Sequence, residues 1–228
     1  MILRFLSLFP DLILSHFKEG ILNIALNKKL FELEVINLRN FANNAYKKVD
    51  SAQISGGAGQ VLDFAPLSNA LSNLSQSHII FLTPSGKQFS NLDAMRLSKR
   101  SDLTIVCGRY EGFDERAIEQ FCDEAFSIGD FILMGGELAG LCISECILRQ
   151  IDGVLGNAKS LKEESFENNL LEAPVFSQNK MDKNAKNGAP NEFFSGNHAK
   201  ISDLKRQLSL FKTQYVRPDL YKRRNKEN

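Results

Sequence analysis

The chain has 228 residues, of which 43% are hydrophobic and 24% are charged, and its formal net charge is +1. This length suits one large domain with a smaller one, and the hydrophobic content is that of a globular protein with a buried core. No uninterrupted apolar run approaches the roughly 20 residues of a membrane span, which excludes a membrane-spanning helix.

The chain begins with an apolar run, residues 2–8, that is typical of a buried strand. The run lacks a basic segment before it and a small-residue cleavage site after it, so we expect a cytoplasmic protein rather than a secreted one. Pro10 and Asp11 then begin a helix whose apolar residues recur at helical spacing. These residues are Ile13, Phe17, Ile21 and Ile24. Residues 31–38 form a second predicted strand.

A polar stretch with several glycines, residues 40–60, shows no clear periodicity. A helix is predicted to begin at Pro66. The elements after it, in chain order, are strand 79–83, helix 88–99, strand 103–107, helix 114–122, extended segment 131–134 and helix 137–149. Strands that alternate with helices predict an α/β fold with a mostly parallel sheet.

The composition changes after Gly156, where large apolar side chains become rare. Residues 157–169 and 178–191 are polar and have the composition of linkers. A short amphipathic helix begins at Ile201 and is followed by a basic tail. We therefore expect an α/β domain over residues 1–155, a linker over 156–170 and a small, mainly helical, basic domain over 171–228.

The four cysteines form no metal or disulfide framework that the sequence reveals. Cys142 and Cys146 share a helical face, but Cys107 and Cys122 lie apart in sequence and no C-x-x-C pair occurs. Small buried thiols in a reducing cytoplasm are the expected explanation for all four.

Three segments rich in glycine and polar residues follow predicted strands. They span residues 83–86, 107–112 and 127–137. Loops at the carboxyl ends of parallel strands are where α/β folds bind ligands, and glycine lets the backbone approach a ligand closely. Each segment alone is better explained as a tight turn, but the three together favour a ligand pocket.

The common glycine motifs do not identify the ligand. The first strand ends in Phe9-Pro10-Asp11 without a G-x-G-x-x-G fingerprint, so a dinucleotide site is disfavoured. The glycine-rich segment 56–59 has no following Lys-Ser or Lys-Thr, so it is not a phosphate-binding P-loop. That segment is either a flexible loop or a functional one.

Seven short motifs carry a family resemblance. They occur at residues 7–10, 82–86, 107–116, 127–133, 135–138, 153–156 and 195–198. With these motifs the chain resembles the bacterial tRNA (guanine-N1)-methyltransferase family over essentially its whole length. That family belongs to the SPOUT methyltransferases, so the resemblance implies a mostly parallel sheet with a deep trefoil knot, and an obligate homodimer. It also implies methyl transfer from S-adenosylmethionine to N1 of the guanosine immediately 3′ of the anticodon in tRNA.

The resemblance assigns the glycine-bearing segments to S-adenosylmethionine, because three loops of that family form the knot and hold the cofactor. The assigned residues are Thr83, Pro84, Gly86, Gly108, Tyr110, Glu111, Ser127, Ile128, Gly129, Asp130, Phe131, Ile132, Leu133, Gly135 and Gly136. Backbone groups would read the adenine edge, and Glu111 would bond the ribose or lie near the sulfonium. Residues 102–145 are strongly acidic, which suits a cationic cofactor, although a solvated acidic face explains most of these charges.

Methylation of guanine N1 needs a base for the N1 proton and a fixed cation for the negative charge that develops on O6. The family uses an arginine on the helix after the knot and an aspartate in the linker. The resemblance maps these roles onto Arg149 and Glu164. Glutamate carries the same chemistry on a stem one methylene longer, and the adjacent Glu163 is an alternative base.

The C-terminal segment is basic. Four of its residues, Lys200, Lys205, Arg206 and Arg217, are expected to contact tRNA. Such contacts to phosphates give affinity and salt dependence rather than sequence choice. Without the motifs, a segment of this composition would be more typical of a solubilising tail.

Two departures from the family pattern keep other functions open. Glu164 replaces the family's aspartate, and residues 176–179 read Phe-Ser-Gln-Asn where the family has Tyr-Thr-Arg-Pro. A catalytically silent tRNA-binding protein and a related SPOUT enzyme with another target nucleotide are therefore alternatives. The family's reaction depends on magnesium, but the sequence offers no dedicated cluster of metal ligands.

Overall fold

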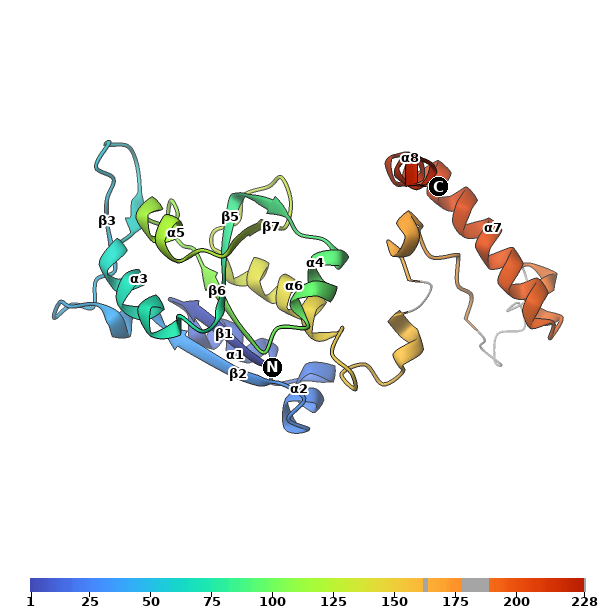
Figure 1. Ribbon diagram of the computed structural model, residues 1–228, viewed down its shortest axis with the longest axis horizontal. Helices are drawn as coiled ribbons and strands as arrows, with labels where there is room; N and C mark the ends of the chain where they lie inside the picture. Colours follow the sequence, from blue (N-terminus) through green and yellow to red (C-terminus); the bar gives the residue numbers. More distant parts are fainter. Residues whose placement is uncertain (162–163, 178–188, 228) are drawn as a thin grey trace. The chain divides into compact units, whose positions relative to one another are not determined.

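The computed structural model describes residues 1–161, 164–177 and 189–227, and the chain divides into two compact units, Met1–Asn157 and Ala158–Asn228. The first unit contains a five-stranded sheet with the order β2-β1-β6-β5-β7, in which every pairing is parallel (Figure 1). The strands are β1 (Ile2–Ser7), β2 (Glu32–Asn37), β5 (His78–Gln88), β6 (Asp102–Cys107) and β7 (Glu124–Ser127). The prediction of an α/β fold with a mostly parallel sheet is therefore confirmed, and the trefoil knot stays a prediction.

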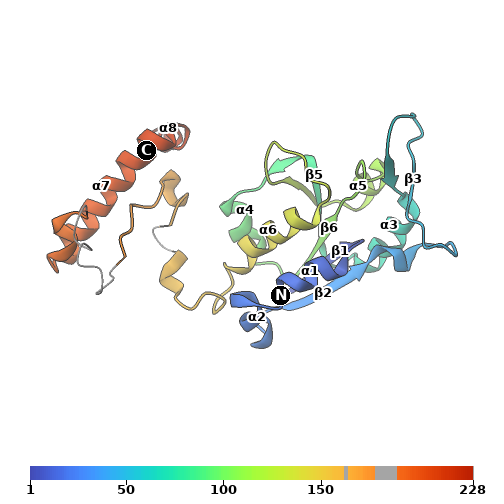
Figure 2. The same cartoon turned by 180° about the vertical axis from the view of Figure 1, so that it is seen from behind.

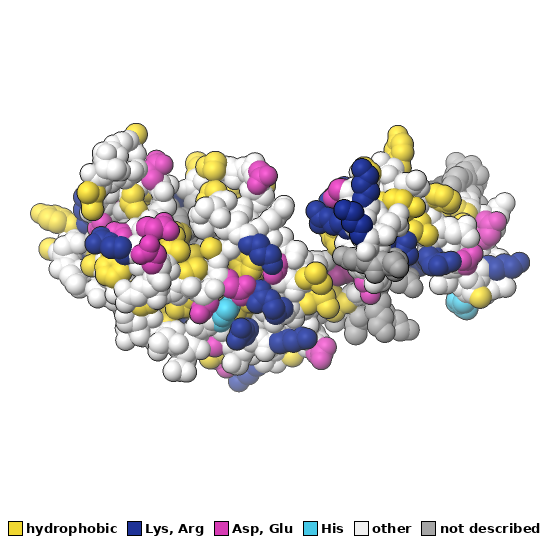
Figure 3. All heavy atoms as spheres, turned by 45° about the horizontal axis from the view of Figure 1, so that its top comes forward, with side chains coloured by type: hydrophobic (Ala, Val, Ile, Leu, Met, Phe, Trp, Pro, Cys, Tyr) yellow, Lys and Arg dark blue, Asp and Glu magenta, His cyan; other side chains and the backbone are white. Residues whose placement is uncertain are grey.

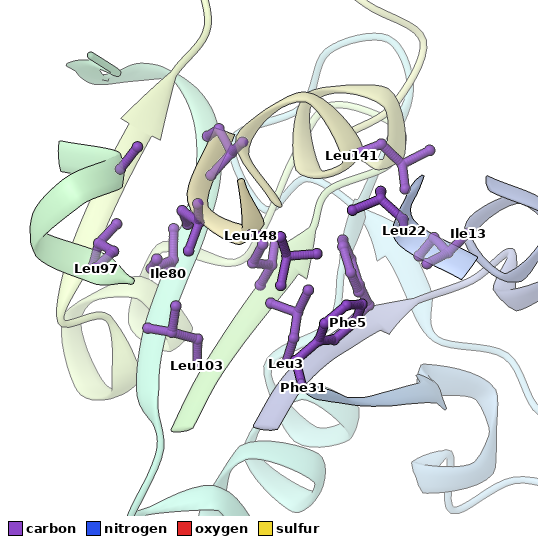
Figure 4. Close-up of a cluster of buried hydrophobic side chains, with 14 of the residues drawn as sticks. Leu3, Phe5, Ile13, Leu22, Phe31, Ile80, Leu97, Leu103, Leu141 and Leu148 are labelled. Carbon is purple, nitrogen blue, oxygen red and sulfur yellow. The ribbon is translucent and has the colours of Figure 1, made fainter. Parts of the chain in front are cut away.

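Helices cover both faces of this sheet (Figures 1 and 2). One face carries α1 (Pro10–His16), α2 (Gly20–Asn27), α4 (Asn91–Leu97) and α6 (Glu137–Leu148), and the other carries α3 (Phe64–Leu71) and α5 (Glu115–Phe121). Alternate strand residues point to opposite faces of the sheet. Leu3 and Phe5 of β1 therefore pack in a buried cluster under the first group of helices, and Leu6 packs in a second cluster under α3 and α5. Figure 4 shows the first of these two buried clusters.

A short antiparallel hairpin, β3 (Asp50–Ala52) and β4 (Gln60–Leu62), occupies part of the stretch that showed no periodicity. It is fixed to the loop after β6 by main-chain hydrogen bonds. Glu111 N–H donates to the Gln60 carbonyl at 2.9 Å, and Leu62 N–H donates to the Gly112 carbonyl at 2.9 Å. The glycine-rich segment 56–59 is therefore the connection of a hairpin anchored beside the end of β6.

Three local predictions were wrong. The helix predicted from Pro10 is two helices, α1 and α2, because Gly20 has a φ of 69°, outside the right-handed helical region. Residues 83–86 are not a loop after a strand but an irregular part of β5, with a register shift between Leu82 and Lys87. The extended segment 131–134 forms no strand, whereas the four-residue β7, which has no apolar run, went unpredicted.

The second unit is helical in the residues that the structure describes. It contains η3 (Ala158–Leu161), η4 (Glu167–Asn169), η5 (Asn191–Phe194), α7 (His198–Val216) and α8 (Pro218–Glu227). Thr213 on α7 accepts a hydrogen bond from Leu171 N–H at 2.8 Å, and Ser209 donates to the Leu171 carbonyl, so α7 holds the segment after η4. The predicted helix after Ile201 is confirmed, and the predicted basic tail is the helix α8.

A separate linker over residues 156–170 stays a prediction. In the described part of the chain, every helix is too short or too polar to cross a membrane.

Candidate active site

A pocket of about 310 Å³ lies beside the irregular part of β5 and the carboxyl ends of β6 and β7. All three glycine-bearing segments contribute to its wall, two of them as loops at one edge of the parallel sheet and residues 83–86 as part of β5. The predicted residues that line it are Thr83, Pro84, Gly108, Tyr110, Glu111, Ser127, Ile128, Gly129, Phe131, Ile132, Leu133, Gly135 and Gly136. The structure therefore places together the segments that the sequence separates by up to fifty residues.

Two residues assigned with this group, Gly86 and Asp130, are not part of the pocket wall. A Cβ at Gly86 would lie 2.6 Å from the Phe126 main-chain nitrogen, so glycine is required there by the close approach of β7. Asp130 is exposed. Their assignment to the cofactor stays a prediction that the geometry of the pocket does not favour.

Bare backbone forms one wall of the pocket. Gly136 N–H donates to the Gly108 carbonyl at 2.7 Å, and a Cβ at Gly136 would stand 2.7 Å from the Gly108 nitrogen. Tyr110, at the rim, has a φ of 59°, a left-handed conformation that is uncommon for a residue with a side chain. The absence of a side chain at Gly136 thus lets the two loops pack closely against each other at this wall.

Two carboxylates, those of Glu111 and Glu115, also line the pocket. Glu111 packs against Gly59 of the β3–β4 hairpin, where a Cβ would lie 2.9 Å from the Glu111 Cδ atom. The Glu111 carboxylate therefore has a fixed neighbour on the side away from β6. Negative side chains in a partly enclosed pocket favour a cationic ligand.

A buried polar network behind the pocket was missed by sequence reasoning. Glu137, fully buried, accepts a hydrogen bond from Ser7 Oγ at 2.7 Å and one from Arg109 Nε at 2.8 Å. Arg109 itself lines the pocket. Burial raises the pKa of the Cys107 thiol well above its usual value, and the charge of Glu137 raises it further, so this thiol stays protonated. The available signal was an acidic residue at the start of a largely apolar helix.

The two predicted catalytic residues belong to different units. Arg149 is half-buried and follows α6, whose 12 residues span about 18 Å from the end that borders the pocket. In its own chain, Arg149 is therefore at the far end of α6 from the pocket. Glu164 belongs to the second unit, and the alternative base Glu163 lies outside the described residues.

The predicted tRNA-contacting residues all lie in the second unit, where Figure 3 shows Lys and Arg side chains on the visible face. Lys200 and Lys205 are exposed on α7. Arg206 lies 3.6 Å from Asp203, and Arg217 donates two hydrogen bonds to Asp219, which lower the pKa of that carboxyl to about 2. Gln178 and Asn179, which replace family residues, lie outside the described residues.

Among the described residues, no group of three or more His, Cys, Asp or Glu side chains could hold a metal ion.

Comparison with known proteins gives a consistent result. The family model described as tRNA (Guanine-1)-methyltransferase TrmD matches residues 1–223. The chain is 54% identical over 220 residues to the tRNA (guanine-N(1)-)-methyltransferase of Helicobacter pylori strain J99, covering 95% of this chain and 96% of the relative. It is 52% identical to the enzyme of that name from Helicobacter hepaticus (95% and 91% covered) and 52% identical to that from Campylobacter jejuni strain RM1221 (95% and 95% covered).

Proposed function

This chain belongs to the tRNA (guanine-N1)-methyltransferase family, and from that premise we propose its reaction in full. It transfers a methyl group from S-adenosylmethionine to N1 of the guanosine at position 37, immediately 3′ of the anticodon in tRNA. The observation that carries this proposal is the convergence of the three glycine-bearing segments into one pocket, in a chain that matches the family over nearly its whole length.

The pocket fits S-adenosylmethionine in shape and in charge. Its volume of about 310 Å³ is at the lower end of the range for small-molecule sites. Main-chain groups of the pocket-lining loops suit the polar edge of an adenine, and the carboxylates of Glu111 and Glu115 suit a sulfonium. When bound, the cofactor supplies a methyl group on a positively charged sulfur.

The remaining chemistry falls to the side chains of the chain itself. Glu164 accepts the proton from guanine N1, so that the N1 lone pair becomes available. Arg149 stabilises the negative charge on O6 with its planar, permanently charged guanidinium. The approach of Glu164 and Arg149 to the pocket is part of this proposal.

A symmetric homodimer with shared active sites is part of this proposal. Apolar side chains are exposed around the first turn of α6: Met134 is 93% exposed, Leu138 55% and Phe9 46%. A second copy related by a two-fold axis would cover such a face. If two α6 helices pack antiparallel across the axis, the far end of one lies beside the pocket end of the other. That arrangement carries Arg149 of one protomer toward the pocket of its partner.

Binding of tRNA and a cytoplasmic location complete the proposal. The exposed lysines of α7 provide contacts to the phosphate backbone. No disulfide joins any of the four cysteines, which all lie among the described residues, and this supports a reducing compartment. Magnesium enters as an ion that the reaction needs, and the described residues contain no cluster of side chains that could hold it.

Methyl transfer to tRNA transcripts that carry G or A at position 37 tests the function. We expect transfer from radiolabelled S-adenosylmethionine to the G37 transcript alone, with mass spectrometry placing the methyl group on that guanine. Transfer to a different nucleotide would identify a related RNA methyltransferase. Cofactor binding with no transfer to any transcript would identify a silent tRNA-binding protein.

A further inference from the structure

The ion pair of half-buried Arg109 and buried Glu137 connects separate parts of the pocket. We propose that Glu137 is a positioning residue for cofactor binding, which acts through Arg109 to hold two of the three pocket segments in register. The inference rests on the proposed function, because it concerns the affinity of the same pocket for S-adenosylmethionine.

Glu137 is fully buried and uses both of its carboxylate oxygens. Oε1 accepts from Ser7 at the end of β1, and Oε2 accepts from Arg109 in the loop after β6. Glu137 begins α6, and the partial positive charge of a helix N-terminus favours a carboxylate there. A charge buried to this extent is stable only if it is paired, so its position depends on Arg109.

Arg109 contacts three parts of the chain with one guanidinium. In addition to its bond with Glu137, it donates to the Met134 carbonyl at 3.3 Å, and its Cζ atom lies 4.2 Å from the centre of the Phe9 ring. Its side chain also fills the space next to Gly135, where a Cβ would collide with it. Glycine at position 135 therefore lets the Arg109 side chain lie directly along the segment before α6.

The main chain of the two segments is joined at the same place. Arg109 and Gly135 form an isolated antiparallel bridge, and Gly136 N–H donates to the Gly108 carbonyl at 2.7 Å. Gly108, Gly135 and Gly136 all line the pocket. Movement of Arg109 would thus change how two segments of the pocket wall are held together, and in the proposed function the cofactor binds in this pocket.

Removal of the Glu137 charge should therefore weaken cofactor binding. Glu137→Gln can keep both hydrogen bonds but leaves the guanidinium without its counter-charge in a mostly buried place, which favours movement of Arg109 toward solvent. Arg109→Gln places an amide nitrogen where Nε was, but leaves the Glu137 charge buried and unpaired. The double variant keeps a neutral hydrogen bond at that position and buries no net charge.

The test is a double-mutant cycle read by calorimetric titration with S-adenosylmethionine, with the melting temperature measured on the same samples. We expect each single variant to raise the cofactor dissociation constant by about tenfold or more, and the double variant to recover most of the loss. The Michaelis constant for tRNA should stay unchanged. Arg4→Gln is the control, because it breaks ion pairs with Glu34 and Asp102 elsewhere in the sheet and should lower the melting temperature alone.

A purely structural role predicts another pattern. Single variants that melt at lower temperature but bind the cofactor as the unmodified protein does would overturn the inference, as would losses of affinity that add in the double variant. If the unmodified protein itself binds no S-adenosylmethionine, the proposed function fails. Intact binding by the unmodified protein and by all variants overturns only the role of Glu137.

Discussion

The carboxylate of Glu111 occupies the space directly beside Gly59, where a side chain at position 59 would otherwise lie. Its Cδ atom is 2.9 Å from the place of a Gly59 Cβ, and Gly59 has a φ of 84°. The same hairpin accepts the Glu111 N–H at the Gln60 carbonyl. The glycine-rich segment 56–59 therefore helps to set the position of a carboxylate that lines the pocket.

Gly59→Ala should weaken cofactor binding because the new methyl group displaces the Glu111 side chain. We expect the dissociation constant for S-adenosylmethionine to rise about tenfold, measured by calorimetry. Gly56→Ala is a matched control, since Gly56 has a similar φ of 76° but open space around its Cβ position. Both variants carry backbone strain, so equal effects on affinity would contradict a specific role of the Gly59 contact.

Asp93 should stabilise the first unit in a pH-dependent way. Burial alone would raise the pKa of this carboxyl, but hydrogen bonds from Lys87, Ser90 and Arg96 outweigh it and hold the pKa below its usual value. A carboxyl with a lowered pKa in the folded state contributes stability above its unfolded pKa of about 3.9, and this contribution is lost as the pH falls through the folded pKa.

Asp93→Asn should therefore lower the free energy of unfolding at pH 7 by about 1–3 kcal/mol, through lost ion pairs and a lost helix cap at Ser90. Urea unfolding of both proteins from pH 7 to pH 2 should show the difference shrinking below about pH 4. Asp11→Asn, at an exposed carboxylate, should change stability by less than about 0.5 kcal/mol. A difference that stays constant with pH would show that the Asp93 charge is not involved.

The sheet and the pocket could be predicted because their signals are local. Apolar runs such as 103–107 mark buried strands, and glycine-bearing segments after them mark the edge where parallel strands end. The strand order could not be predicted in this way. β1 pairs with β6 across a hundred residues, and the sequence of neither strand indicates which strand it pairs with. The four residues of β7 pair with β5 through main-chain hydrogen bonds, which carry little sequence information.

The network behind the pocket was hidden for a related reason. In the sequence Arg109 and Glu137 are charged residues near glycines, and charged residues are usually exposed. They form an ion pair because the chain, after β7, returns to the end of β6 and brings Glu137 next to Arg109. Arg149 illustrates the reverse case, since the family resemblance assigns it to the reaction, but in its own chain it follows the end of α6, about 18 Å from the end that borders the pocket.

Glu164→Gln should abolish most of the methyl transfer while cofactor binding survives. The amide cannot accept the N1 proton, and loss of a general base typically costs about 100-fold to 10,000-fold in rate. Single-turnover kinetics with G37 tRNA would measure the rate, and calorimetry the cofactor affinity. Glu167→Gln is the matched control within the same segment, and Glu163→Gln tests the alternative base. Near-normal transfer by Glu164→Gln, with a severe loss in Glu163→Gln, would move the base to Glu163.

Lys200 and Lys205 should contribute more to tRNA binding than Arg217. The two lysines are exposed, whereas the Arg217 guanidinium already binds the Asp219 carboxylate at 2.7 Å and 2.8 Å. Alanine at either lysine should lower the slope of log affinity against log salt concentration by about 1, as expected for one lost phosphate contact. Filter binding at several salt concentrations measures that slope. Lys18→Ala, at an exposed lysine of the first unit, should leave it unchanged.

Mixed dimers can reveal which protomer supplies Arg149 to a given pocket. An Arg149→Ala chain has an intact pocket, and a Gly136→Val chain has an intact Arg149 but a pocket closed by contact with Gly108. If each pocket uses the Arg149 of the partner subunit, a mixed dimer contains one complete site. Because random pairing gives about half mixed dimers, refolding the two inactive chains together should restore about a quarter of the normal activity.

If each pocket uses its own Arg149, neither site of the mixed dimer is complete and the mixture should stay as inactive as its components. Arg149→Lys in place of Arg149→Ala tests whether charge alone suffices, since lysine keeps the charge but not the planar pair of donors. Activity of the Arg149→Ala homodimer close to that of the unmodified protein would remove Arg149 from the reaction. The distance along α6 favours the partner, because in its own chain Arg149 could reach the pocket only if the helix unfolded.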